Sequence, residues 1–74
     1  MSEMSILDRT GDIKIVWDPH RLDEVASAKA AFEAAKKKKM VAYSVSESGE
    51  ADEIIRDFDP NAEKIIMRPA MVGG

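Results

Sequence analysis

The chain has 74 residues, 45% of them hydrophobic and 34% charged, with a net charge of −3 and no cysteine. This length suits one domain and this composition is typical of a globular protein, so residues 1–74 are expected to form a single α/β domain. The acidic balance argues against nucleic-acid binding, the lack of cysteine excludes disulfides, and no apolar stretch approaches the roughly 20 residues of a membrane span.

The first clear element is a strand predicted at residues 13–17, where large apolar side chains occupy every second position. Residues 10–12 before it have the chemistry of a turn, because glycine accepts positive φ and aspartate bonds its own backbone. Residues 5–8 are compatible with a short strand that forms a hairpin across this turn, and this alternative stays open.

A helix is predicted at residues 22–38, after the pair Asp18 and Pro19. Proline lacks the N–H that a sheet ladder needs, and this pair suits the opening of a helix. Acidic residues in the first turn and lysines in the last complement the helix dipole. Apolar residues at three- and four-residue spacing form one stripe for the core: Leu22, Val25, Ala28, Phe32 and Ala35.

The second half of the chain predicts two more strands with a short helix between them. In the strand at residues 40–46, Val41, Tyr43 and Val45 are expected to face the core and the smaller residues between them to face away. The short helix is expected at residues 51–58, and the last strand, at residues 63–68, ends before a proline. Ile54, Ile55 and Phe58 are the residues that the short helix is expected to bury.

This order of elements predicts a small two-layer α/β (α+β) domain. One amphipathic helix packs on a three- or four-stranded mixed sheet, with a parallel pair formed by the strand–helix–strand unit. A single helix covers only one face of such a sheet and leaves its edge strands open. We therefore expect other protein subunits, or further copies of this chain, to dock by the free face or by strand addition.

The sequence contains no recognisable catalytic, cofactor-binding or metal-binding constellation. His20 is the only histidine, and Asp18 and Asp23 near it are interpreted as ordinary residues of a helix start rather than as metal ligands. No serine lies in a glycine-rich elbow, and the paired carboxylates are interpreted as surface charge. We therefore expect no enzyme activity, no cofactor and no small-molecule substrate. The lysine run at residues 36–39 is interpreted as the solvated end of the helix.

The candidate partner-binding residues are the apolar C-terminal tail and one tryptophan. The tail, residues 69–74, contains Met71 and Val72 beyond a proline and ends in Gly73 and Gly74. Trp17 is a candidate exposed anchor, because aromatic side chains dominate many protein interfaces. The elements Trp-Asp-Pro and Phe-Asp-Pro, at residues 17–19 and 58–60, place an aromatic before a capping aspartate, as in a hydrophobic staple.

Two resemblances follow from these motifs. The order of the elements, the length and the terminal Gly73 and Gly74 resemble a ubiquitin-like β-grasp domain, which implies that Gly74 is activated and joined to an amine. The tail departs from that family because it is apolar and interrupted by proline rather than basic and extended.

Trp-Asp-Pro, an alanine-rich helix, Phe-Asp-Pro and a Gly-Gly ending also resemble small uncharacterised proteins of prokaryotes and their phages. This implies a small structural or accessory component, either cytoplasmic or incorporated in a virion. The N-terminus has no basic region followed by an apolar one, so no secretory signal peptide is predicted. The leading hypothesis is a non-enzymatic protein–protein interaction module. The alternatives are a ubiquitin-like modifier and an acidic regulator of a basic partner.

Overall fold

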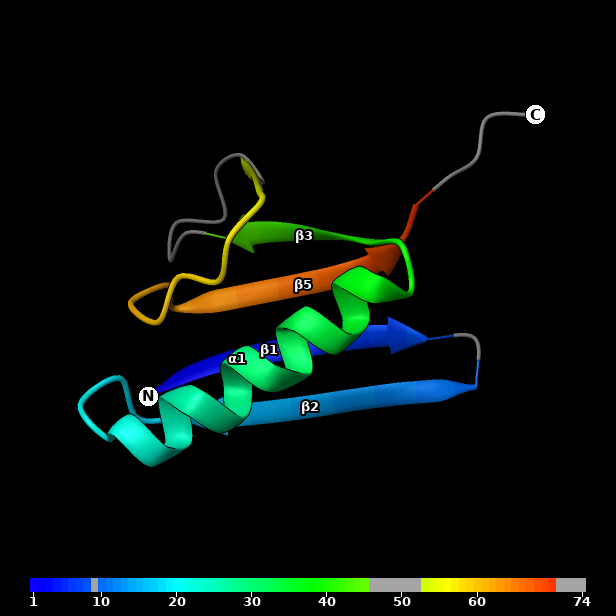
Figure 1. The fold of residues 1–74 in the computed structure, drawn as a ribbon. Coiled ribbons are helices and arrows are strands. Elements are labelled where there is room, and N and C mark those ends of the chain that lie inside the picture. The colour runs from blue at the N-terminus through cyan, green and yellow to red at the C-terminus, as the bar shows by residue number, and fades with distance from the viewer. Residues whose placement is uncertain (9, 46–52, 71–74) are drawn as a thin grey trace.

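The computed structural model describes residues 1–8, 10–45 and 53–70. They form one helix and a five-stranded mixed sheet with the strand order β2-β1-β5-β3-β4 (Figure 1). The two-layer α+β architecture with one helix on a mixed sheet is confirmed, and the sheet has five strands rather than three or four. The bounds are β1 Ser2–Asp8, β2 Gly11–Trp17, α1 Leu22–Lys37, β3 Met40–Val45, β4 Glu53–Ile55 and β5 Lys64–Pro69.

The N-terminal strand, left open from the sequence, is one of the central strands. β1 pairs antiparallel with β2 over seven positions, from Ser2 opposite Trp17 to Asp8 opposite Gly11. On its other side it pairs parallel with β5. Gly11 has a φ of 143°, a region that L side chains rarely adopt, and this explains a glycine where the hairpin returns. Met4 and Ile6 of β1 are buried, whereas Glu3, Ser5 and Leu7, which point to the opposite face, are not.

The parallel pair forms between different strands from those predicted. β3 runs antiparallel to β5, so β2 and β3, which flank α1 in the chain, point in the same direction. They are not neighbours, because β1 and β5 lie between them. The adjacent parallel strands are β1 and β5, the first and last of the described strands.

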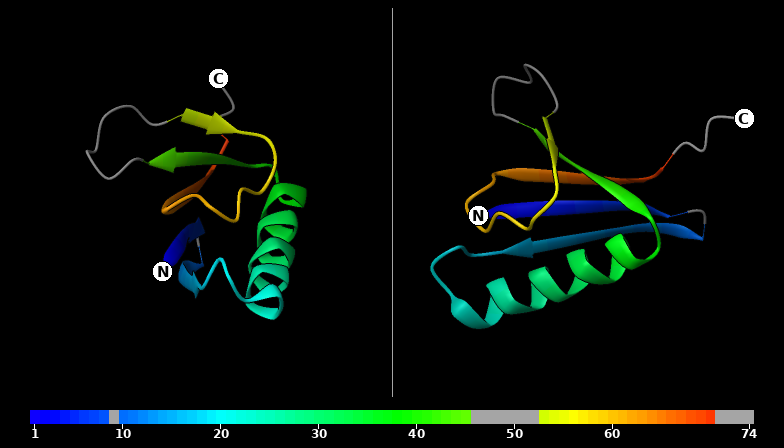
Figure 2. Two further views of the ribbon diagram at one scale, coloured as in Figure 1. Left: turned by 90° about the vertical axis from the view of Figure 1, so that its left-hand side faces the viewer. Right: turned by 45° about the horizontal axis from the view of Figure 1, so that its top comes forward.

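The helix α1 lies across one face of the sheet, and no other described residues form a layer over the opposite face (Figure 2). Ala28, Phe32 and Ala35 are buried beneath it, as predicted. They pack on the fully buried strand residues Met4, Trp17, Ile65 and Met67. The expected burial of Leu22 is wrong, because this first residue of the helix is 85% exposed.

The predicted orientation of β3 is reversed in the structure. Ala42, like Met40, is buried under the helix, whereas Tyr43 lies on the opposite face. The register explains this result, because Tyr43 pairs with Ile66 between positions where Val45 pairs with Lys64 and Val41 with Arg68. Residues directly opposite each other share a face. Turning Tyr43 inward would therefore bury two cations, which costs far more than burying alanine instead of tyrosine gains.

The short helix expected at residues 51–58 is also wrong. Residues 53–55 form β4, which pairs with the outer edge of β3. Isoleucine is β-branched and favours strands, and β3 offers unpaired backbone groups for it to join. Ile55 and Phe58 pack against the core, whereas Ile54 points to the opposite face and is 63% exposed.

Candidate functional site

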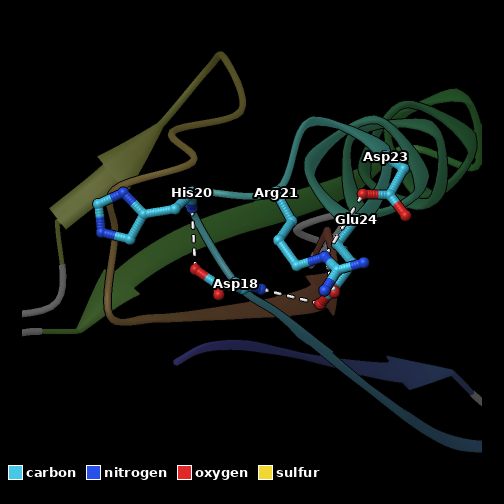
Figure 3. Close-up of polar contacts among 5 residues, drawn as sticks. All are labelled: Asp18, His20, Arg21, Asp23 and Glu24. Atoms are coloured by element: carbon cyan, nitrogen blue, oxygen red, sulfur yellow. Dashed lines mark hydrogen bonds and ion pairs between the residues drawn. The ribbon is translucent and has the colours of Figure 1, made fainter.

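Charged residues gather where β2 leads into α1 (Figure 3). The Asp18 carboxylate accepts a hydrogen bond from the His20 backbone N–H at 2.9 Å, and the Asp18 N–H donates to Glu24 Oε1 at 3.1 Å. Arg21 Nε lies 3.1 Å from Glu24 Oε2 and 3.8 Å from Asp23 Oδ1. These contacts fix the entry of the chain into the helix, since Arg21 occupies the N-cap position without a side-chain cap.

The contacts of this cluster are those of a helix entry rather than of a metal site. The His20 ring points away from the other four side chains in Figure 3. Among the residues that the structure describes, no group of three or more His, Cys, Asp or Glu side chains could hold a metal ion. In the same part of the chain, no helix has the length and apolarity that crossing a membrane requires.

The two aromatic-Asp-Pro elements pack against each other rather than acting as separate helix staples. The rings of Trp17 and Phe58 lie 5.2 Å apart, and Trp17 Nε1 donates a hydrogen bond to the Pro60 carbonyl at 3.0 Å. Asp18 and Asp59 each accept a hydrogen bond from the backbone N–H two residues later, at 2.9 Å in both cases. Each aspartate thus closes its own turn, and neither caps α1.

Trp17 is therefore not an exposed anchor. Its side chain has no exposed surface, because β2 turns it under the helix, where it meets Phe58. The other candidate partner-binding residues, Met71, Val72, Gly73 and Gly74, lie outside the described residues. Of the five candidates, the structure thus places only Trp17, and it places that residue in the core.

The face of the sheet opposite α1 carries exposed apolar side chains, and we call it the open face. Ile54 and Val16 expose 63% and 49% of their surface there, and Tyr43 and Ile66 are half-buried between them. Cross-strand pairing aligns Ile54, Tyr43 and Ile66 in one row. The strand positions of the open face are Glu3, Ser5, Leu7, Asp12, Lys14, Val16, Val41, Tyr43, Val45, Ile54, Lys64, Ile66 and Arg68.

Several charged side chains of the open face contact one another or border the apolar row. Glu3 contacts Lys14 at 2.9 Å and Lys64 at 3.8 Å, and the hydrogen bond from Lys14 lowers the pKa of the Glu3 carboxyl. The Arg68 guanidinium lies 5.5 Å from the centre of the Tyr43 ring, within the range of a cation–π interaction. Three cations and two carboxylates occupy the strand positions, so this face is net positive on a net negative chain.

A second surface feature lies between α1 and the β1–β2 hairpin, and we call it the groove. It has a volume of about 170 Å³ and a mostly apolar lining. Lys38 and Asp8 also line the groove, and their side chains form an ion pair at 3.6 Å. Its apolar lining residues are Ile6, Ile13, Ile15, Ala31, Ala34, Ala35 and Met40.

The sequence predicted a free face but not all of its residues, and it did not predict the groove. The open face includes the large residues of β3, which the alternating pattern assigned to the core. The groove depends on where alanines of α1 meet isoleucines of β2, and small residues leave space only once that pairing is known. The position of Ile13 in the sequence could have indicated the groove, because this residue begins an apolar strand face directly after a turn. The structure shows that Ile13 is 54% exposed.

No family model matches the chain, and neither a curated protein nor a solved structure matches it. The geometry of the described residues is therefore the basis for any functional interpretation.

Proposed function

We propose that this protein is a non-enzymatic protein–protein interaction module, a small structural or assembly subunit of a larger complex such as a phage virion. The observation that carries the proposal is the open face, where Ile54 is exposed in one row with half-buried Tyr43 and Ile66, and Val16 is exposed on β2 at the other edge of the sheet. An uncovered sheet face with apolar side chains offers area for docking, and exposed apolar patches on small domains commonly mark interaction sites.

The charges of the open face suggest the chemistry of the partner. Lys14 and Lys64 both contact Glu3, whereas Arg68 stacks beside Tyr43 at the border of the apolar row. Arginine and tyrosine are enriched where binding energy concentrates. A partner with an apolar patch bordered by carboxylates would fill the row and pair with Arg68, which favours acidic protein surfaces over basic ones.

The test is affinity purification from the native source with an N-terminal tag, comparing the wild type with Ile54→Glu and Tyr43→Glu. Both variants place a negative charge in the apolar row while leaving the buried core residues in place. We expect co-purifying subunits to be lost from both variants. Leu22→Glu is the matched control, because Leu22 is 85% exposed on the helix rather than on the sheet. Subunits that stay bound to both open-face variants would overturn the proposal.

A ubiquitin-like modifier is the second candidate. It is supported by one helix across a mixed sheet with the first and last described strands paired in parallel, an arrangement compatible with the β-grasp-like order of elements. Under this function, Gly74 would be joined to an amine of another protein. Adducts that survive denaturation and disappear in Gly74→Ala would support it. An absence of such adducts in the native source would reject it.

A further inference from the structure

We propose that β2 pairs with β2 of a second copy of this chain, antiparallel and around a two-fold axis at Ile13. The two five-stranded sheets would then form one continuous sheet with both helices on the same side. This inference rests on the proposed function and names a second copy of the chain as one partner. The two copies would bind through the β2 edge of the sheet rather than through the open face.

The first support is the difference between the two edges of the sheet. β2 and β4 are the outer strands, with seven and three residues respectively. An edge strand leaves a row of backbone N–H and C=O groups without strand partners, and natural proteins commonly shorten such edges. β4 follows this rule. β2 does not, and five of its seven residues are exposed.

The second support is the position of α1 relative to this edge. The helix begins beside the end of β2 from which the chain enters α1 and crosses diagonally toward β3, so its later turns lie farther from the β2 edge (Figure 1). The groove of about 170 Å³ lies on this side, lined by Ile13, Ala31 and Ala34 among others. Ile13 is 54% exposed, so another strand can approach here without displacing the helix, and pairing would cover this side chain.

The third support is the charge pattern, which favours an axis at Ile13 over an axis at either of its two neighbours. Facing residues must lie on the same side of the joined sheet, so Asp12 and Lys14 of the open face must meet open-face positions. An axis at Asp12 or at Lys14 would place two identical charges directly opposite each other. An axis at Ile13 instead places Asp12 of each copy opposite Lys14 of the other, with the two Ile13 side chains together on the helix side.

The proposed dimer is expected to be weak and salt-sensitive. A single added strand buries less than the 1,200–2,000 Å² of a standard stable interface, so a dissociation constant in the micromolar range is expected. Lys14 already contacts Glu3 of its own chain at 2.9 Å, so its ammonium would lie between two carboxylates in the dimer. The two Asp12–Lys14 pairs stay at the surface, where salt screens them.

The experiment is sedimentation velocity on the purified full chain, from low micromolar to submillimolar concentration. We expect a concentration-dependent dimer of the wild type. Asp12→Lys and Lys14→Asp each place like charges opposite each other twice, so each variant alone should dimerise about tenfold more weakly. When the two variants are mixed, both facing pairs are opposite in charge again, and a heterodimer should form.

Mixing the two variants distinguishes a loss of this interface from a folding defect, because a misfolded variant would not form the heterodimer. Lys29→Asp on α1 is the control for a change in net charge and should dimerise like the wild type. A wild-type chain that is monomeric at submillimolar concentration would overturn the inference. So would single variants that dimerise normally, or variants that fail to pair when mixed. Because only the purified chain is used, failure here leaves docking by the open face untouched, and the Ile54→Glu result does not decide the dimer.

Discussion

Both faces of the sheet carry many apolar residues, but the two faces differ in how far these residues are buried. Under the helix, Met4, Ile65 and Met67 have no exposed surface, whereas on the open face Ile54 and Val16 remain exposed. The difference is the single layer supplied by α1. The comparison shows that apolar content alone does not identify the core of a one-helix domain, because the described part of the chain supplies a layer for only one of the two faces.

Trp17 and Val16 are neighbours in β2 that point to opposite faces, so they test this comparison directly. Of the variants considered, we expect Trp17→Ala to lower the free energy of unfolding most. Trp17 is fully buried, packs on Phe58 and bonds to the Pro60 carbonyl, so its truncation leaves a cavity and an unpaired carbonyl. Large-to-alanine changes of this kind cost about 3–5 kcal/mol. A domain of this size has little more stability than that, so the variant should be largely unfolded at 25 °C.

Val16→Ala is the matched control for this prediction. Val16 is adjacent in the chain but points to the open face, where it is 49% exposed, so its truncation should cost less than about 1 kcal/mol. Urea unfolding followed by circular dichroism measures both variants, because the helix signal does not depend on the tryptophan. Equal losses in the two variants would mean that the faces are not distinguished as described.

The next largest loss of stability is expected for a substitution that tests the orientation of β3. Ala42 is fully buried under α1, so Ala42→Leu must push the helix away and should cost about 1–3 kcal/mol. Tyr43→Leu changes a half-buried residue of the open face and should cost clearly less. The midpoints of thermal unfolding measure this difference. If Tyr43→Leu proves the more harmful change, the strand faces the other way and the original pattern interpretation is right.

β3 also shows how far the sequence predicts this fold. The helix and the strands at residues 13–17 and 63–68 were predictable because each carries its own periodicity. The face of β3 was not, because it depends on register with β5, where Lys64 and Arg68 must stay solvated. β4 was missed for a similar reason, since three residues become a strand only beside the free edge of β3.

The candidate site was less predictable than the fold. Trp17 was proposed as an anchor because it is aromatic, and its burial depends on Phe58, 41 residues further along the chain. An open face was expected from the single helix, and that expectation is confirmed. Its residues in β3 were not identified, because the alternating pattern assigned the large side chains Val41, Tyr43 and Val45 to the core. In the structure these side chains lie on the open face.

The connection between α1 and β3 contains a residue with positive φ, and this connection can be stabilised. Lys39 has a φ of 65° in the turn after the helix, a conformation that costs an L side chain roughly 1 kcal/mol and glycine almost nothing. Lys39→Gly should therefore stabilise the domain by up to about 1 kcal/mol, as measured by urea unfolding. Lys37→Gly is the control, since a glycine within the helix should destabilise by a similar amount. A loss of stability in Lys39→Gly would show that the turn gains nothing from glycine.

The smallest expected effect concerns the charges of the open face and appears only at acidic pH. Lys14 lowers the pKa of Glu3 below its ordinary value of 4.5, so the ionised carboxylate is favoured in the folded protein. This contribution is present above pH 4.5 and is lost as the pH falls through the lowered folded pKa. Glu3→Gln should therefore lose less stability than the wild type between neutral pH and pH 3. Lys14→Gln should behave in the same way, because it removes the cation that causes the shift. Urea midpoints at the two pH values measure the effect, and equal losses in all three proteins would show that the contact between Glu3 and Lys14 does not contribute to stability.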